Sequence, residues 1–156
     1  MKTSKYILLV SIVLVQCLMA KPNIETVREQ IKKMHQERID TALKGDYSKT
    51  LSIYAKDALI MPSFKTPVKG IKGIEKMYAE DRKHGVKHQT ISYNTTDDWM
   101  CGDDYYMRGT WAMSFTSEYN DRPVAYYGSF FEIWGKQKDG SYKVEFNIWN
   151  LDHPPL

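Results

Sequence analysis

The carboxylate with the clearest potential for chemistry is Glu132, because it sits inside an apolar run from Phe130 to Trp134. Side chains two apart in a strand share one face, so a strand here places Glu132 beside Phe130 and Trp134. If that face is buried, the charge needs a partner, which Arg38 or Arg108 could supply. If the face is convex, Glu132 meets water, which is the default for a charged residue. Two interpretations therefore stand: a solvated glutamate, or a candidate catalytic residue with a pKa raised by burial.

The last predicted strand carries a second group of polar candidates. Residues 144–149 read Val-Glu-Phe-Asn-Ile-Trp, so an apolar face alternates with a mixed face that includes Asn147 and Trp149. An amide can orient a ligand but takes no proton at ordinary pH, which makes Asn147 a binding candidate rather than a base. Glu145 shares its face with Lys143, which favours a solvated side chain.

The histidines do not form a metal or cofactor motif. His84 and His88 have the i, i+4 spacing of a helical zinc site, but Gly85 ends the helix between them. His35 and His153 have no partner at ligand spacing. The sequence also contains no Gly-rich phosphate loop, nucleophile elbow or paired-cysteine motif. We therefore predict neither a metal nor a cofactor.

The helices that must position these residues come first in the chain. Apolar spacing predicts a long amphipathic helix over 23–44 and another over about 70–83. Asp46 can cap a short helix between them. Residues 58–61 read as a strand that stops at Pro62.

A sheet follows the helices, which is the α+β order. Four period-2 runs rich in β-branched and aromatic residues predict strands at about 87–95, 104–117, 123–135 and 141–150. The alternating face that contains Trp111 is apolar, so we expect it to face the helices. The acidic pairs at 97–98 and 103–104 are interpreted as solvated loop charges rather than a calcium site.

The length and the N-terminal residues indicate one exported domain. Two lysines precede an uncharged apolar run over 6–20, as in a secretory signal peptide, and the run is short for a membrane span. We therefore predict a signal peptide over 1–20 and a single secreted or periplasmic domain over 21–156, with no membrane association after cleavage. Cleavage after Cys17 is the alternative.

The charge of the mature domain excludes two classes of partner. Removing two lysines from a chain with 22 basic and 19 acidic residues leaves a net charge of +1, so we expect no binding to nucleic acid or anionic membranes. Cys101 is the only cysteine left. The fold is therefore self-sufficient, or Cys101 pairs between chains.

Several short motifs occur in an order typical of one superfamily. The order and spacing of these motifs resemble the nuclear transport factor 2-like superfamily, specifically its SnoaL-like and ketosteroid-isomerase-like members. They are Lys44-Gly45-Asp46, Ile53-Tyr54-Ala55-Lys56-Asp57-Ala58, Pro67-Val68-Lys69-Gly70, the run 128–136, and Asn147-Ile148-Trp149-Asn150. The resemblance covers nearly all of 21–156. It implies a cone, in which a strongly curved antiparallel or mixed sheet wraps the long N-terminal helix with two further helices, and leaves an apolar cavity.

The resemblance does not carry the isomerase machinery with it. Counted along the motifs, the position of the isomerase base falls on Pro62, the oxyanion tyrosine on Arg38, and the protonated acid near Ser129. Epoxide hydrolases of this fold place an aspartate on the last strand, where this chain has Asn147. These substitutions favour binding over catalysis.

The leading hypothesis is therefore an exported protein whose hydrophobic cavity binds a small apolar or aromatic molecule. The candidate lining residues are Arg38, Tyr54, Trp111, Asn147 and Trp149, and the resemblance implies a homodimer formed through the sheet. One alternative is a lyase, isomerase or hydrolase that uses a buried carboxylate such as Glu132. The other is a non-catalytic module for oligomeric assembly.

Overall fold

A computed structural model describes residues 23–152. The long helix α2, Ile24–Ala42, is the central element of the fold. The predicted signal peptide and His153 lie outside the described residues. The helix begins where the Asn23 side chain accepts a hydrogen bond from the backbone N–H of Glu25 at 3.0 Å. The side chains buried along one face of α2 are Val27, Ile31, His35, Arg38 and Ala42. The helix thus carries two polar groups into the interior.

Two shorter helices and two strands follow α2. The Asp46 carboxylate accepts a hydrogen bond from the backbone N–H of Ser48 at 2.8 Å, so the predicted cap precedes helix α3, Ser48–Ser52. Strand β1, Tyr54–Met61, starts four residues earlier than predicted. Strand β2, Val68–Lys69, was not predicted because two residues show no periodicity. Helix α4, Gly70–Lys83, matches its prediction.

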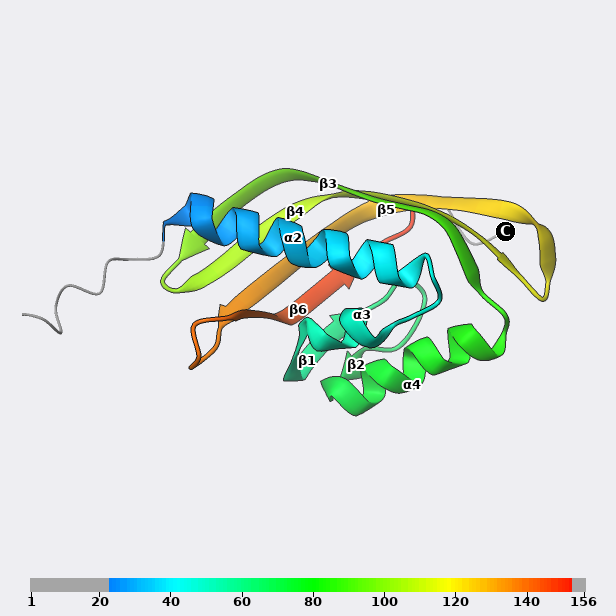
Figure 1. Cartoon of the computed structure of the whole chain (residues 1–156), viewed down its shortest axis with the longest axis horizontal. Helices are drawn as coiled ribbons and strands as arrows, with labels where there is room; N and C mark the ends of the chain where they lie inside the picture. Colours follow the sequence, from blue (N-terminus) through cyan, green and yellow to red (C-terminus); the bar gives the residue numbers. More distant parts are fainter. Residues whose placement is uncertain (1–22, 153–156) are drawn as a thin grey trace, which may run out of the picture.

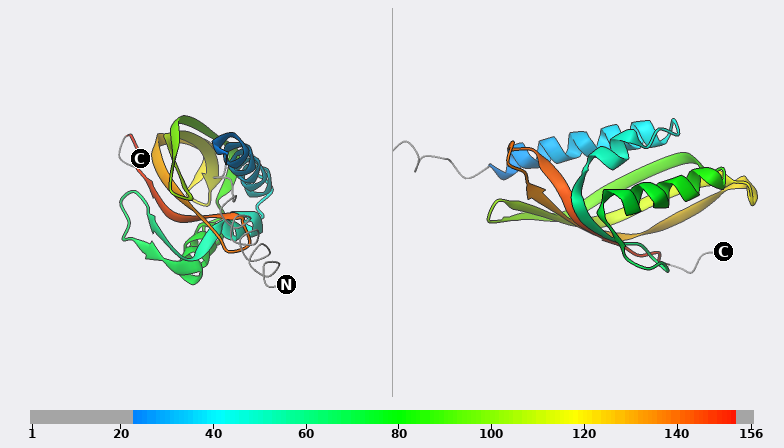
Figure 2. Two further views of the ribbon diagram at one scale, coloured as in Figure 1. Left: turned by 90° about the vertical axis from the view of Figure 1, so that its left-hand side faces the viewer. Right: turned by 90° about the horizontal axis from the view of Figure 1, so that it is seen from below.

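The remaining strands complete a curved sheet of six with the order β2-β1-β6-β5-β4-β3. They are β3, Lys87–Cys101; β4, Asp104–Ser117; β5, Asn120–Lys136; and β6, Tyr142–Trp149. Strands β1 and β6 run parallel and all other neighbours run antiparallel, so the sheet is mixed. Figure 1 shows the long strands bending over α2, and Figure 2 shows the sheet curling around the helices without closing. The predicted α+β fold is confirmed.

One acidic pair lies on a strand and not in a loop, which corrects the interpretation of residues 97 and 98. Strand β3 continues through both residues because their charges are paired. Asp97 accepts a hydrogen bond from Arg108 across the β3/β4 pair at 2.8 Å. Asp98 accepts hydrogen bonds from Arg28 of α2 and from the Tyr105 hydroxyl, each at 2.8 Å.

Two glycines let a neighbouring backbone segment approach their own strand more closely than a side chain would permit. A Cβ atom at Gly109 would lie 2.0 Å from the backbone oxygen of Asn94. A Cβ atom at Gly128 would lie 1.8 Å from the backbone oxygen of Asn150. Both contacts are with backbone, which cannot move aside as a flexible side chain can.

The core lies between the concave face of the sheet and helices α2 and α4. Ile31 of α2, Ile74 of α4 and Trp134 of β5 are almost fully buried there. As predicted, the strand face that contains Trp111 faces the helices. Among residues 23–152, no helix is long and apolar enough to cross a membrane.

Candidate functional site

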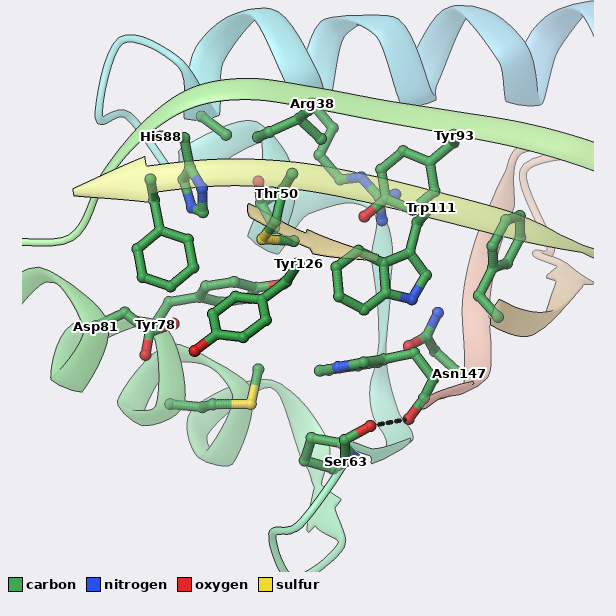
Figure 3. Close-up of a pocket in the computed structure, with 18 of the residues that line it drawn as sticks. Arg38, Thr50, Ser63, Tyr78, Asp81, His88, Tyr93, Trp111, Tyr126 and Asn147 are labelled. Atoms are coloured by element: carbon green, nitrogen blue, oxygen red, sulfur yellow. Dashed lines mark hydrogen bonds between the residues drawn. The ribbon is translucent and has the colours of Figure 1, made fainter. Parts of the chain in front are cut away.

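A cavity of about 590 Å³ lies between the concave face of the sheet, the C-terminal half of α2 and helix α4 (Figure 3). This volume falls in the range of about 300–1,000 Å³ that is usual for small-molecule sites. Half of the residues in its wall have apolar side chains, with the tyrosines not counted: Ile39, Ala42, Pro62, Phe64, Met77, Ile91, Trp111, Met113, Phe115, Phe130, Trp149 and Leu151.

All five residues that the sequence indicated as lining candidates lie in this wall. They come from four elements: Arg38 from α2, Tyr54 from β1, Trp111 from β4, and Asn147 and Trp149 from β6. Whether they contact a ligand stays a prediction, but the fold does bring them together around one space.

Arg38 is the buried cation of the wall, with 6 % of its surface exposed. Its guanidinium lies 4.6 Å from the centre of the Tyr93 ring, a cation–π distance. Nη1 lies 3.6 Å from Glu132 Oε1, and Nη2 lies 2.9 Å from His35 Nδ1. Figure 3 shows Arg38 and Tyr93 side by side above the cavity.

The hydrogen bonds of His35 fix its tautomer. A guanidinium can only donate, so Nδ1 of His35 accepts the hydrogen bond from Arg38 and carries no proton. Nε2 therefore carries the proton and donates it to Glu132 Oε2 at 3.1 Å. Burial, followed by the charge of Arg38, lowers the pKa of His35, which agrees with a neutral ring.

Glu132 is fully buried and paired, so the default expectation of a solvated side chain was wrong. The partner cation is Arg38, because Arg108 lies on the outer face and pairs with Asp97. Glu132 Oε2 also accepts a hydrogen bond from Trp134 Nε1 at 2.9 Å, and Oε1 accepts one from Asn147 Nδ2 at 2.6 Å.

The surroundings of Glu132 also keep it ionised. Burial alone would raise the pKa of Glu132, but His35 and the charge of Arg38 lower it to about 2. The carboxylate does not belong to the cavity wall and lies behind Arg38 and Asn147. With both oxygens occupied and a low pKa, Glu132 is suited to hold these two side chains in place rather than to take a proton from a ligand.

Asn147 is oriented by this carboxylate. Its amide nitrogen donates a hydrogen bond to Glu132, so its side-chain oxygen points away from Glu132. Asn147 is 5 % exposed, and its Oδ1 has no hydrogen-bond partner among the described residues. A buried polar atom without a partner costs about 1–3 kcal/mol. A partner supplied by a bound molecule would remove that cost.

The far end of the cavity contains further unpaired polar atoms. The Tyr47 hydroxyl, Thr50 Oγ1 and His88 Nδ1 all belong to wall residues and, within the described part of the chain, have no partner. The Tyr47 ring packs against His88 with ring centres 6.2 Å apart. Burial lowers the pKa of His88, which keeps the ring neutral. Figure 3 shows His88 and Asn147 on opposite sides of the cavity.

Three wall tyrosines remain protonated. Burial is the main cause that raises the pKa of Tyr54, to about 12, and it also raises the pKa of Tyr78 and Tyr93. A phenol in this state offers a hydrogen-bond donor and is not available as a base near neutral pH.

Two of the three positions that correspond to the isomerase machinery lie in the cavity wall. Pro62 and Arg38 both line the cavity, so the wall has a proline and a cation where the isomerases have a base and a tyrosine. Ser129 is exposed and lies outside the wall, and its backbone oxygen accepts a hydrogen bond from Trp111 Nε1 at 3.3 Å. Among residues 23–152, no group of three or more potential ligands is arranged to hold a metal ion.

Two residues that matter to the site, His35 and His88, were not predicted from the sequence. His35 was set aside for lack of a metal partner, although its position three residues before Arg38 on one helix face was a usable signal. His88 was treated only as part of a broken zinc pair. Its place on an inward-facing strand position, opposite Phe115 of β4, could not be recognised without the register of the sheet.

Comparisons with known proteins agree on the fold. No protein-family model matches the sequence, and no curated protein matches it. A ketosteroid isomerase-like protein from Erwinia carotovora atroseptica has a TM-score of 0.69 at 12 % identity, over 81 % of this chain and 96 % of that one. An NTF2-like protein with a cystatin-like fold from Novosphingobium aromaticivorans has a TM-score of 0.64 at 13 % identity, over 85 % of this chain and 86 % of that one.

A third solved structure, ActVI-ORFA from Streptomyces coelicolor, has a TM-score of 0.68 at 11 % identity, over 81 % of this chain and 98 % of that one. All three likenesses extend over most of both chains. The predicted resemblance to ketosteroid isomerase-like and nuclear transport factor 2-like proteins is therefore confirmed at the level of the fold.

Proposed function

We propose that this chain is an exported binding protein whose cavity takes a small apolar or aromatic molecule. The observation that carries the proposal is a cavity of about 590 Å³ with largely apolar walls and buried polar atoms that have no partner among residues 23–152. Apolar walls favour a ligand that leaves water, and a few fixed polar groups orient it. Export rests on the signal-peptide pattern of residues 1–20.

The geometry around Glu132 favours binding over a reaction at that residue. The enzyme alternative requires a carboxylate that reaches into the cavity and takes up a proton. Glu132 lies behind the wall, and its pKa is lowered to about 2. The assembly alternative requires no ligand, so the two non-catalytic functions are distinguished by a binding test.

The test is a titration of the mature domain with N-phenyl-1-naphthylamine, an uncharged aromatic probe whose fluorescence rises in apolar surroundings. We expect saturable binding of one probe per chain. Replacing Met113, which lies in the wall, with tryptophan (Met113→Trp) fills part of the cavity and should weaken binding at least tenfold.

The matched control is Thr110→Trp on the same strand, where the side chain is exposed on the outer face. This variant adds the same ring and should bind the probe as the wild type does. Absence of saturable binding to the wild-type domain, or equal binding by Met113→Trp and wild type, would argue against the proposed function.

A further inference from the structure

At one end of the cavity, the N–H groups of Arg38 offer hydrogen-bond donors and the side-chain oxygen of Asn147 offers a hydrogen-bond acceptor. We infer that the ligand is an uncharged aromatic or apolar molecule with a hydroxyl group, and that the hydroxyl docks between Arg38 and Asn147. The inference rests on the proposed function, because it names the class of molecule that the same cavity would bind.

The acceptor is the Asn147 side-chain oxygen, and its orientation is not free. An ionised carboxylate can only accept hydrogen bonds, so Glu132 requires the nitrogen end of the amide, 2.6 Å away. A flip of the amide would place two oxygens against each other. The oxygen of Asn147 is therefore held on the side away from Glu132, where it is buried and has no partner within the part of the chain that the structure describes.

The donor is the Arg38 guanidinium. Its contacts with His35, Glu132 and Tyr93 use only part of the five N–H groups that a guanidinium carries. Arg38 lines the cavity, so the remaining groups can reach a ligand. Arg38 Nη1 and Asn147 Nδ2 lie 3.6 Å and 2.6 Å from the same oxygen, Oε1 of Glu132, which brings the two side chains to one end of the cavity. Figure 3 shows Arg38 above Asn147, with Trp111 between them in the view.

The charge at this end is already balanced within the protein. Arg38 is cationic, Glu132 is anionic, and the hydrogen bonds of His35 make that ring neutral. Elsewhere in the wall, Lys65 and Asp81 contribute one charge of each sign. A ligand anion would therefore enter a site whose cation is already paired, and would meet the oxygen of Asn147.

A hydroxyl matches this arrangement better than other common head groups. It can accept a hydrogen bond from Arg38 and donate one to Asn147 at the same time. A ketone only accepts, which leaves Asn147 unpaired, whereas an ammonium only donates and is repelled by Arg38. A carboxylate satisfies Arg38 but places negative charge against the Asn147 oxygen.

The test compares three probes that share one aromatic body: naphthalene, 2-naphthol and 2-naphthoate. Calorimetric titration of the mature domain at pH 7 should rank 2-naphthol tightest, about tenfold tighter than naphthalene, with 2-naphthoate weaker than 2-naphthol. Equal affinity for naphthalene and 2-naphthol would overturn the hydroxyl inference and leave the proposed function intact. Tighter binding of 2-naphthoate than of 2-naphthol would overturn the inference that the head group is uncharged.

A variant locates the hydroxyl. Asn147→Leu keeps the approximate size of the side chain but removes the acceptor, so the preference for 2-naphthol over naphthalene should fall at least threefold while naphthalene still binds. Asn94→Leu changes an exposed asparagine on β3 and should keep the wild-type preference. An undiminished preference in Asn147→Leu would overturn the docking position. If none of the three probes binds the wild type, both the inference and the proposed function fail.

Discussion

Glu132 determines the polarity of the cavity although it does not touch the cavity space. It accepts hydrogen bonds from His35, Trp134 and Asn147 and pairs with Arg38. A carboxylate only accepts, so it requires the protonated nitrogen of His35 and the nitrogen end of the Asn147 amide. One buried charge thereby selects the tautomer of a histidine and the direction of an amide. Removing the charge should therefore affect stability as well as ligand preference.

The variant Glu132→Gln tests the structural part of this role. It leaves the buried Arg38 without a counter-charge, so we expect a loss of about 3 kcal/mol in the free energy of unfolding at pH 7, measured by urea denaturation. Glu145→Gln, one strand away, is the matched control. That glutamate is exposed on β6, and its replacement should change the free energy by less than about 0.5 kcal/mol.

The contribution of Glu132 to stability depends on pH. The pKa of Glu132 is lowered in the folded state from 4.5 to about 2. Its stabilisation is therefore complete above about pH 4.5 and is lost as the pH falls toward 2. The stability difference between wild type and Glu132→Gln should shrink over that window. A difference that stays constant from pH 7 to pH 2 would contradict the ionised, paired carboxylate.

At the level of residues, the sequence predicted the members of the wall better than their roles. Arg38 and Asn147 could be placed at the cavity because motif spacing and strand period fix the direction of a side chain. The burial of Glu132 could not be predicted from its strand alone. It depends on four partners from α2, β5 and β6, which meet only in the folded chain.

At the level of elements, the close backbone contacts at Gly109 and Gly128 leave no room for a side chain. We expect Gly128→Ala to destabilise the domain by about 2 kcal/mol or more, because its Cβ would overlap the backbone oxygen of Asn150. Thermal unfolding followed by circular dichroism measures the effect.

Gly135→Ala is the comparison within the same strand. Its Cβ would meet only the carboxylate end of the exposed Glu145 side chain, which can rotate away. This variant should lose less than about 1 kcal/mol. Equal losses for the two variants would show that the backbone contact at Gly128 is not what limits the substitution.

Among the elements, the helices and the strand centres were predicted closely, and the strand ends were not. The long helix α2 and helix α4 have clear amphipathic spacing. Glycines with positive φ, Gly45 and Gly85, follow within three residues of their ends at Ala42 and Lys83. By contrast, β3 continues through Asp97 and Asp98, whose polar character indicated a loop. Ion pairs with Arg108 and Arg28 hold these residues in the strand, and such long-range partners leave no local signal.

For the whole molecule, the outer face of the sheet presents an aromatic surface. Trp99 stacks on Tyr106 with ring centres 5.6 Å apart, and Phe131 contacts both Tyr106 and Phe146. Trp99 is 40 % exposed. Large exposed apolar patches mark interaction sites in soluble proteins.

We therefore propose the homodimer that the resemblance implied, and expect twice the mass of one chain in solution. The mass of a large ring would favour the assembly alternative. The mass of a single chain would contradict the proposed homodimer.

Native mass spectrometry of the mature domain, purified under mild conditions with 2-naphthol added, tests the central proposal most directly. The same spectrum gives the number of chains and the number of bound molecules. We expect a dimer that carries one 2-naphthol per chain, loses it on collisional activation, and fails to bind it in the Met113→Trp variant. Protein without bound 2-naphthol, or equal occupancy in wild type and Met113→Trp, would contradict a ligand-binding function for this cavity.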